Sequence, residues 1–403
     1  MVVANRDLIR AINRFVILHC IRENERISRI NIARATGLSQ ASVTSITAQL
    51  LSEGLLLEKE SGQSMGGRRP VMLALNPEGA YAVGVYLSIR QVSVVLVNLQ
   101  ANIISNYILP LQQIHYSPET ISDKIVQAVQ ACIWKADYSK GQIAGIGVAT
   151  PGLVDSSSGI LRFLPNYQWE EVQLRDLVRQ RIDHSVYIEN SANVLAVSEQ
   201  WFGEGRGIDN FIVVTLENGV GLGIVINGQV YRGQKGIAGE FGHTIVEPDG
   251  PLCRCGMKGC LEAIVGITAI VNAAKAAAQE KKWRPRNPVK ISIEEVIEAA
   301  DGGEPALQKI YAKAGWVLGM GISNLKRMFS PAKIIISGSG VGAGKLIFDP
   351  MFAALDHYKS SKTNNDSPIV VHNWDHLDYA RGAGSLVLQE VYKSPAHGII
   401  PTI

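Results

Sequence analysis

The sequence has no hydrophobic run long enough for a membrane span and has few cysteines. No window of its 403 residues approaches the roughly 18 uninterrupted apolar residues of a membrane helix. The start, Met1 to Arg6, lacks the apolar core of a signal peptide, so we expect a cytoplasmic protein. Three of the five cysteines lie between residues 253 and 260. An odd, clustered set argues against a disulfide framework and favours metal binding or free thiols.

Most of the chain also lacks a net charge of either sign. Residues 1–80 carry ten Lys or Arg against seven Asp or Glu, whereas the rest of the chain carries 29 of each. With 46% hydrophobic residues there is ample material for a packed core, which excludes wholesale disorder. The length predicts two or three domains. A basic head on a neutral body indicates an anionic partner, with nucleic acid as the leading candidate.

The first fifty residues follow the pattern of a helix-turn-helix. Apolar spacing predicts helices over residues 5–23, 28–35 and 40–51, with Gly37 at the turn between the last two. The expected N-caps are Ser28 and Ser39. The residues expected to be buried are Leu8, Ile12, Phe15 and Val16 on the first helix, Ile32 on the second, and Val43, Ile46, Leu50 and Leu51 on the third. Two short helices about a glycine turn are typical of a DNA-binding module.

The exposed face of the third predicted helix carries short polar side chains, although solvated helix faces favour better helix formers such as Glu and Lys. Small donors and acceptors are suited to reading base edges in a major groove. A glycine-rich segment between short strands at 55–58 and 71–75 predicts a wing whose arginines enter a minor groove. The predicted DNA contacts are Ser39, Gln40, Ser42 and Ser45 on the helix and Arg68 and Arg69 in the wing. The alternative is a three-helix interaction domain with a solvated basic face.

After residue 79 the pattern becomes that of an α/β body. A strand pair expected over 81–99 recurs at 210–231 around a glycine-rich turn, which indicates an internal duplication and two similar lobes. Helices are expected near 118–136, 263–279, 294–300 and 306–328, and further strands near 143–148 and 333–337. A cleft between two lobes suits a small ligand. The glycines at 221 and 223, and the run 337–344, are either phosphate cradles or tight turns.

One histidine and three cysteines give the strongest local signal. The predicted metal ligands are His243, Cys253, Cys255 and Cys260. Three thiolates and an imidazole form the tetrahedral set that structural zinc takes, and four protein ligands leave no open position for catalysis. The alternative is a chance cluster of buried reduced cysteines.

Polar side chains accompany this cluster. Asn190, Glu240, His243 and Glu262 supply an amide, two carboxylates and an imidazole. Together such groups can hold the hydroxyls of a sugar by hydrogen bonds. The alternative is a polar network that only supports the zinc ion.

These segments resemble the ROK family of bacterial sugar kinases and sugar-responsive repressors. The resemblance is carried by Gly236-Ile-Ala-Gly-Glu-Phe-Gly-His243 and Cys253-Arg-Cys-Gly-Met-Lys-Gly-Cys-Leu-Glu262, and it covers nearly the whole chain. It implies an α/β fold, an N-terminal winged helix-turn-helix followed by a two-lobed actin-like (sugar kinase-like) body. It also implies zinc on His243 and the three cysteines, and a sugar at the four polar residues named above. By the same resemblance Asn166 would line that pocket.

Two departures separate the chain from the kinase members that it resembles. Those kinases have an Asp-x-Gly-Gly-Thr phosphate loop, where this chain has Tyr86 to Arg90. They also carry a general-base Asp after the asparagine, where this chain has Ser191. Losing a general base typically costs ~10²–10⁴ in rate. Because positioning and base are both lost, and because kinase members lack the N-terminal head, we expect a regulator and not an enzyme.

The sequence therefore predicts a transcriptional repressor of carbohydrate-utilisation genes. Its operator affinity would be controlled by a sugar or sugar derivative bound between the lobes of a homodimer or homotetramer. The expected domains are a head at 1–78, a first lobe at 79–200 and a second lobe at 201–403 whose C-terminal helix packs back on the first. The alternatives are a residual sugar kinase and a zinc-stabilised scaffold without a sugar ligand. Xylose, glucose, N-acetylglucosamine and their phosphates all remain open as effectors.

Overall fold

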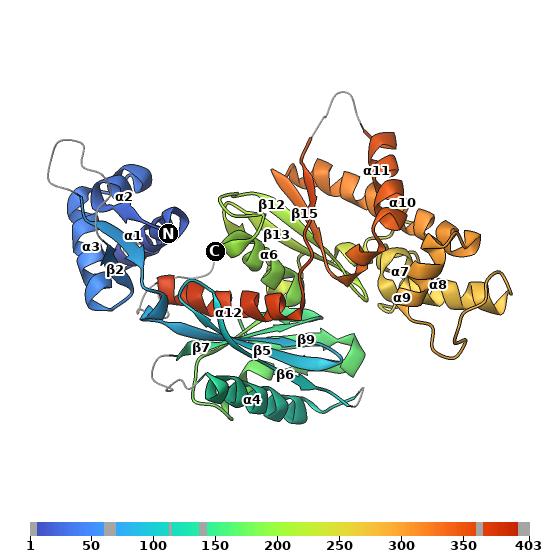
Figure 1. The fold of residues 1–403 in the computed structure, drawn as a ribbon, viewed down its shortest axis with the longest axis horizontal. Helices are drawn as coiled ribbons and strands as arrows, with labels where there is room; N and C mark the ends of the chain where they lie inside the picture. Colours follow the sequence, from blue (N-terminus) through green and yellow to red (C-terminus); the bar gives the residue numbers. More distant parts are fainter. Residues whose placement is uncertain (1–5, 60–69, 113–114, 137–142, 360–365, 394–403) are drawn as a thin grey trace. The chain divides into compact units, whose positions relative to one another are not determined.

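The computed structural model describes residues 6–59, 70–112, 115–136, 143–359 and 366–393 (Figure 1). The chain forms two compact units, one built from residues 1–191 and 376–403 and the other from residues 192–375. No helix in the described ranges combines the length and hydropathy that a bilayer crossing requires.

The head is a three-helix module with a small sheet. Helices α1 (Arg6–Asn24), α2 (Arg29–Thr36) and α3 (Gln40–Ser52) precede the hairpin β2 (Leu56–Lys59) and β3 (Met72–Leu75), and β1 (Ile27–Ser28) pairs with β3. The predicted caps are confirmed, since Ser28 accepts from the Asn31 amide and Ser39 from the Ser42 amide. Gly37 has φ +71°, the left-handed turn that lets α3 follow α2.

The buried face of α1 differs from the prediction. Ile12 is 49% exposed, and Phe15 and Val16 are only half-buried. Among the residues of this helix whose burial is described, the buried ones are Ala11, Arg14, Ile17, Leu18, Cys20 and Ile21. Arg14 lies on this face, and its Nη1 is 2.6 Å from Oε2 of Glu53 at the end of α3. Local periodicity does not reveal this ion pair, so the sequence pattern alone misplaces the buried face.

The first unit contains a five-stranded sheet. Its order is β11 (Val186–Asn190), β7 (Ile143–Thr150), β4 (Tyr81–Leu87), β5 (Gln91–Asn98) and β6 (Ile103–Pro110). The strands β4, β5 and β6 are antiparallel, whereas β7 and β11 run parallel to β4. Helix α4 (Pro118–Lys135) covers one face (Figure 1). A small antiparallel sheet, β8 (Leu153–Asp155), β9 (Ile160–Leu164) and β10 (Trp169–Val172), precedes α5 (Leu174–Arg179).

The second unit repeats this sheet. The order is β14 (Gln229–Val230), β13 (Val220–Ile226), β12 (Phe211–Leu216), β15 (Lys333–Ser337) and β16 (Ile369–Val371). Again three antiparallel strands are followed by two parallel ones. The same topology in the same chain order agrees with the duplication predicted from the two hairpins.

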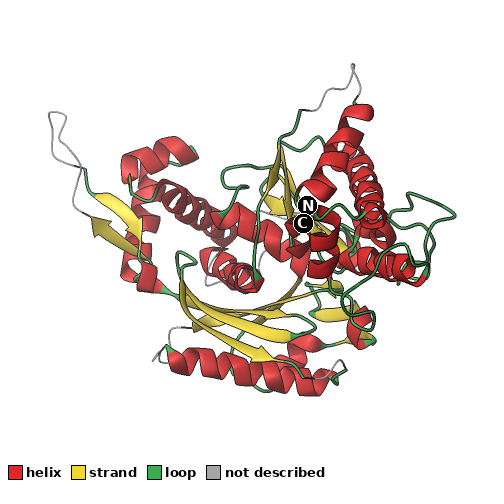
Figure 2. Cartoon of the chain, turned by 45° about the vertical axis from the view of Figure 1, so that its right-hand side comes forward, coloured by secondary structure: helices red, strands yellow, loops and turns green. Residues whose placement is uncertain are grey.

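Helices surround this second sheet (Figure 2). They are α6 (Ser191–Phe202), α7 (Glu262–Val265), α8 (Ile267–Gln279), α9 (Ile293–Asp301), α10 (Pro305–Phe329) and α11 (Lys345–His357). Almost all of α6 belongs to this unit, so the boundary falls at Ser191 and not at residue 200. A Cβ on Gly223 of β13 would lie 2.5 Å from the Ala192 carbonyl oxygen, so the glycine permits the close contact between helix and strand.

The last described helix, α12 (His376–Lys393), belongs to the first unit, as the predicted return of the C-terminal helix requires. It packs on β4 and β7 at very short range. A Cβ on Gly84 would lie 1.8 Å from the Ala380 carbonyl oxygen, and one on Gly147 would lie 1.9 Å from that of Ala383. The strand glycines are therefore needed for this contact.

A short 3₁₀ turn, η1 (Pro77–Gly79), joins the head to the first sheet. The Leu99 amide donates to the Pro77 carbonyl oxygen over 3.1 Å. The carbonyl of Leu99 in turn accepts from the hydroxyl of Tyr392, a fully buried residue of α12. Since α12 also contacts α1, the head rests on the C-terminal helix as well as on its own connection.

Candidate functional site

The four predicted metal ligands come together in the second unit. The ligand atoms of His243, Cys253, Cys255 and Cys260 all lie within 4.8 Å of one another. Nδ1 of His243 is 3.5 Å from Sγ of Cys253, and the Sγ atoms of Cys255 and Cys260 are 3.6 Å apart. Tetrahedral zinc with ordinary bond lengths separates such ligand atoms by roughly 3.6–3.8 Å. The donor set and its spacing therefore fit a tetrahedral metal ion.

The loop that carries these ligands is tightly folded. The Cys253 amide donates to the Met257 carbonyl oxygen over 2.8 Å, and the Gly256 amide to that of Cys253 over 3.0 Å. Gly256 and Gly259 have φ of +88° and +73°, the left-handed conformation that glycine adopts readily. A short loop with two left-handed residues can bring thiols that follow His243 by 10, 12 and 17 residues around one ion.

Glu240 and Glu262 lie beside this cluster. Oε2 of Glu240 is 3.7 Å from Nε2 of His243, whose Nδ1 faces the thiols. Burial raises the pKa of Glu240, and the neighbouring charge of Glu262 raises it further. Glu262 is 5% exposed and accepts from the Val220 amide and from Arg254. Two carboxylates and an imidazole therefore share one polar region next to the metal-ligand loop.

The two predicted asparagines belong to the first unit. Asn190, the last residue of β11, donates from Nδ2 to the Gly152 carbonyl oxygen over 2.6 Å. The backbone amide of Asn190 donates to Oε1 of Glu189, a residue that is 1% exposed. Asn166 lies in the 3₁₀ turn η3 (Pro165–Tyr167) between β9 and β10. The structure therefore groups Glu240, His243 and Glu262 in one unit and places the asparagines in the other.

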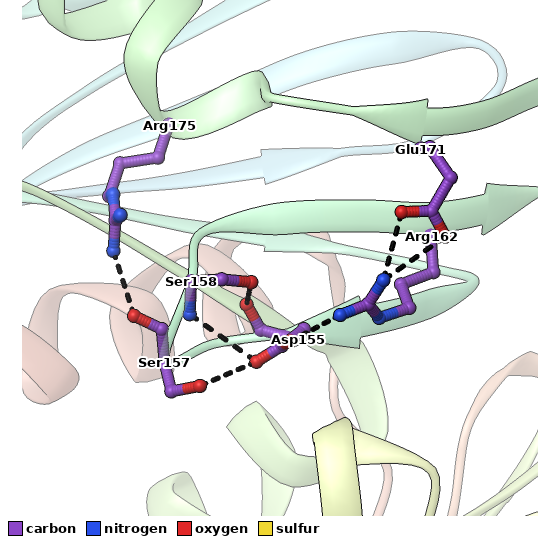
Figure 3. A network of polar contacts seen from close by, with 6 residues as sticks. All are labelled: Asp155, Ser157, Ser158, Arg162, Glu171 and Arg175. Carbon is purple, nitrogen blue, oxygen red and sulfur yellow. Dashed lines mark hydrogen bonds and ion pairs between the residues drawn. The ribbon is translucent and has the colours of Figure 1, made fainter.

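A polar network supports the hairpin that carries Asn166 (Figure 3). Arg162 of β9 binds Asp155 of β8 over 2.7 Å and Glu171 of β10 over 2.8 Å. Ser157 adds a hydrogen bond to the Asp155 carboxylate. One guanidinium thus links all three strands of the small sheet. These residues carry no signal in the sequence, because charged pairs across a hairpin have no motif.

The polar side chains of the predicted recognition helix differ in their exposure. Gln40 and Ser45 are exposed, and Ser42 is half-buried. Ser39 caps the helix, and its hydroxyl also donates to that of Ser42 over 2.9 Å. Arg68 and Arg69 lie outside the described residues.

The segment 86–90 and the glycine-rich run 337–344 both make contacts within the chain itself. The ring of Tyr86, at the end of β4, stacks on Tyr379 of α12 with centroids 4.5 Å apart. At the start of the run after β15, the carboxylate of Glu217 accepts from both the amide and the hydroxyl of Ser339. An aromatic pair thus contacts the segment that replaces the phosphate loop of the kinase members, and an internal carboxylate contacts the run 337–344. The contact of Glu217, 122 residues from its partner, had no local signal in the sequence.

A helix-turn-helix head on a duplicated actin-like α/β body with a Cys/His loop defines a class of proteins. Residues 84–390 match the ROK family, and residues 12–61 match the MarR family. The chain belongs to the ROK family.

Among the proteins similar to this chain are transcriptional regulators. The xylose repressor of Bacillus subtilis is 29% identical over 388 residues, which are 96% of this chain and 98% of the repressor. The DNA-binding transcriptional dual regulator NagC of Escherichia coli is 29% identical over 386 residues, 96% of this chain and 94% of NagC.

Similar solved structures cover either nearly the whole chain or about three quarters of it. A ROK family transcriptional regulator, a homologue of the E. coli MLC protein, superposes with a TM-score of 0.82 at 25% identity and covers 96% of this chain and 98% of its own. A ROK family glucokinase from Streptomyces griseus, in complex with glucose and AMPPNP, has a TM-score of 0.66 at 28% identity. It covers 99% of its own chain but only 76% of this one. The fold is therefore a helix-turn-helix head followed by a sugar kinase-like body.

Proposed function

We propose that this protein is a DNA-binding transcriptional repressor of carbohydrate-utilisation genes in the cytoplasm, and that a sugar or sugar derivative controls its affinity for the operator. The observation that carries this proposal is the joining of a capped helix-turn-helix to a ROK body in one chain. Regulators of this family match nearly its full length, whereas the kinase matches the body alone.

The effector site that we propose is centred on Glu240, His243 and Glu262. All three lie beside the metal-ligand loop, where hydroxyl groups of a sugar find two carboxylates as acceptors. Asn166 and Asn190 are further predicted contacts from the first unit. A structural zinc ion on His243 and the three cysteines would stabilise the loop, since the ligand spacing fits that ion.

The body would act as a sensor and not as a catalyst. Tyr86 stacks on Tyr379 where kinase members need an open phosphate loop, and Ser191 lacks the basicity of the Asp that it replaces. The Glu217 carboxylate, bound to Ser339, would repel a nucleotide phosphate from the second glycine-rich segment. Positioning of phosphate and activation of the hydroxyl are therefore both missing.

DNA recognition would use α3, with Ser39, Gln40, Ser42 and Ser45 facing the major groove and Arg68 and Arg69 contacting the backbone or the minor groove. A symmetric homodimer, or a homotetramer made from two, would present two such helices about 34–36 Å apart, one turn of DNA. The sugar shifts the operator affinity only if it binds one conformation better than the other.

Fluorescence anisotropy tests the proposal. The purified chain is titrated onto its own upstream DNA at fixed salt, with and without D-xylose, D-glucose, N-acetyl-D-glucosamine and their phosphates. We expect one sugar to shift the operator affinity about tenfold, a coupling of about 1.4 kcal/mol.

Two variants accompany this titration, one in the head as a test and one in the second unit as its control. Ser45→Ala is expected to weaken specific binding by about 1–3 kcal/mol if its hydroxyl reads a base. Glu280→Gln, an exposed carboxylate in the second unit, is expected to leave binding unchanged. Absence of any specific operator binding would contradict the proposal and leave the head as a protein-interaction module.

A further inference from the structure

Glu262, the most buried carboxylate of the proposed effector site, is held by an arginine of the metal-ligand loop. Nη2 of Arg254 donates to Oε2 of Glu262 over 2.9 Å, and Nε of Arg254 forms an ion pair with Oε1. The Val220 amide donates to Oε2 over 3.0 Å. Glu262 is 5% exposed, while the side chain of Arg254 is 43% exposed. A two-pronged guanidinium contact fixes both the plane and the charge of a carboxylate.

The surrounding backbone leaves the carboxylate no room to turn. A Cβ on Gly219 would lie 2.0 Å from Oε2 of Glu262 and 2.7 Å from Nη2 of Arg254. A Cβ on Gly242 would lie 3.3 Å from Cβ of Glu262. Two glycine positions thus bring the main chain directly against the ion pair, and the carboxylate keeps the orientation that Arg254 imposes.

The position of Arg254 follows from the fold of the loop. It lies between Cys253 and Cys255, in the turn closed by the Cys253 and Gly256 amides. Glu262 follows Cys260 by two residues, at the start of α7. Arg254 is therefore adjacent to two cysteines of the cluster, and Glu262 is two residues from the third. The packing of the cluster thus determines whether the two side chains meet.

We propose that Arg254 is a positioning residue for the effector: it holds the Glu262 carboxylate in one orientation, so that the remaining lone pairs of the carboxylate accept hydrogen bonds from sugar hydroxyls. This inference rests on the proposed function. The Glu262 oxygens are acceptors that would repel a phosphate, so we expect the sugar to present hydroxyl groups to Glu262. Because Arg254 cancels the carboxylate charge, an ammonium group gains little at this place.

Calorimetry with the metal-loaded full chain tests this role, with D-xylose, D-glucose and N-acetyl-D-glucosamine as ligands. Arg254→Met is expected to weaken the affinity for the best of these sugars about tenfold or more, because a charged hydrogen-bonded contact is lost. Arg254→Lys restores the charge without the fork and is expected to give an intermediate affinity. Lys258→Met is the matched control, since it removes an exposed cation from the same loop and leaves the ion pair intact.

Charge selectivity separates positioning from a general loss of structure. Without Arg254 the Glu262 charge is uncompensated, so Arg254→Met is expected to bind D-glucosamine better, relative to D-glucose, than the unaltered chain does. A variant that is merely destabilised loses affinity for both sugars by the same factor. Metal content and the thermal unfolding midpoint are measured for each variant alongside.

The outcomes are distinguishable. Wild-type affinity in Arg254→Met, or an equal loss for D-glucose and D-glucosamine, would overturn the inference while the proposed function stands. An unaltered chain that binds none of the sugars would overturn the sugar-responsive function itself, and the inference with it.

Discussion

Asp155 shows how a single buried charge is retained in the first unit. Its side chain is almost fully buried, and it accepts from Arg162 and from Ser157 and Ser158. Burial alone would raise the pKa of this carboxyl, but the hydrogen bonds and the guanidinium outweigh it and hold the pKa well below its usual range. A carboxyl with a lowered pKa stabilises the folded state above its unfolded pKa, and this contribution is lost as the pH falls through the folded pKa.

Asp155→Asn should therefore destabilise the protein near pH 7 by about 1–3 kcal/mol. The difference from the unaltered chain should shrink as the pH falls below about 4, where the unfolded chain begins to bind the proton first. Urea unfolding of both proteins between pH 3 and pH 7 measures it. Asp176→Asn, which removes an exposed carboxylate of the same unit, is the control and should show no such pH dependence. A difference that stays constant over the whole range would contradict this account of Asp155.

Residue chemistry was readable from the sequence where partners are near in the chain. The Cys/His cluster and the helix caps were predicted because residue type and short spacing define them. Arg254 was visible inside the cluster, but its partner followed only from the folded loop. Glu217 and Ser339 meet across the second sheet, and no spacing rule reports such a contact.

The elements were predicted better than the faces that they bury. Long periodic segments such as α4, α8 and α10 lie within a few residues of the expected ranges. The predicted buried face of α1 was wrong, because its apolar residues extend around the helix and the charged Arg14 lies on the buried face beside Glu53. The packing of α12 on β4 and β7 also depends on glycines whose role is invisible until helix and strand are brought together.

Gly84→Ala should disrupt the contact of α12 with β4. The new methyl group would overlap the Ala380 carbonyl oxygen, and the rigid helix backbone cannot move aside cheaply. We expect a loss of about 3 kcal/mol or more in the free energy of unfolding, or no soluble protein. Gly342→Ala is the matched control, because nothing lies within 4 Å of its added Cβ. Equal unfolding midpoints for the two variants would refute the close approach.

At the scale of the whole molecule, the chain passes between its units twice, near residues 191 and 375. The segments beside these two passages are tied together within the second unit. Glu199 of α6 is fully buried and accepts from the Trp374 indole and, over 3.0 Å, from Nδ1 of His372. Burial raises the pKa of Glu199. These hydrogen bonds hold the segment after residue 191 and the segment before residue 375 together.

The duplicated body should not turn over ATP. A coupled assay with each sugar of the panel is expected to give no sugar-dependent ADP release above the level without protein, because the phosphate segments are occupied by Tyr86 and Glu217 and no Asp follows Asn190. A ROK glucokinase assayed under the same conditions with glucose is the positive control. Sugar-dependent turnover by this chain would identify it as a kinase with a DNA-binding head.

The seating of the head on α12 has a genetic consequence. The buried hydroxyl of Tyr392 and the contact of α12 with α1 support a module encoded at the opposite end of the gene. A stop codon at the start of α12, near residue 376, would spare every residue predicted to touch DNA, metal or sugar. The truncated protein would nevertheless lack α12, on which the helix-turn-helix head packs. Such an allele should be recovered in a screen for constitutive expression, together with missense alleles of α3.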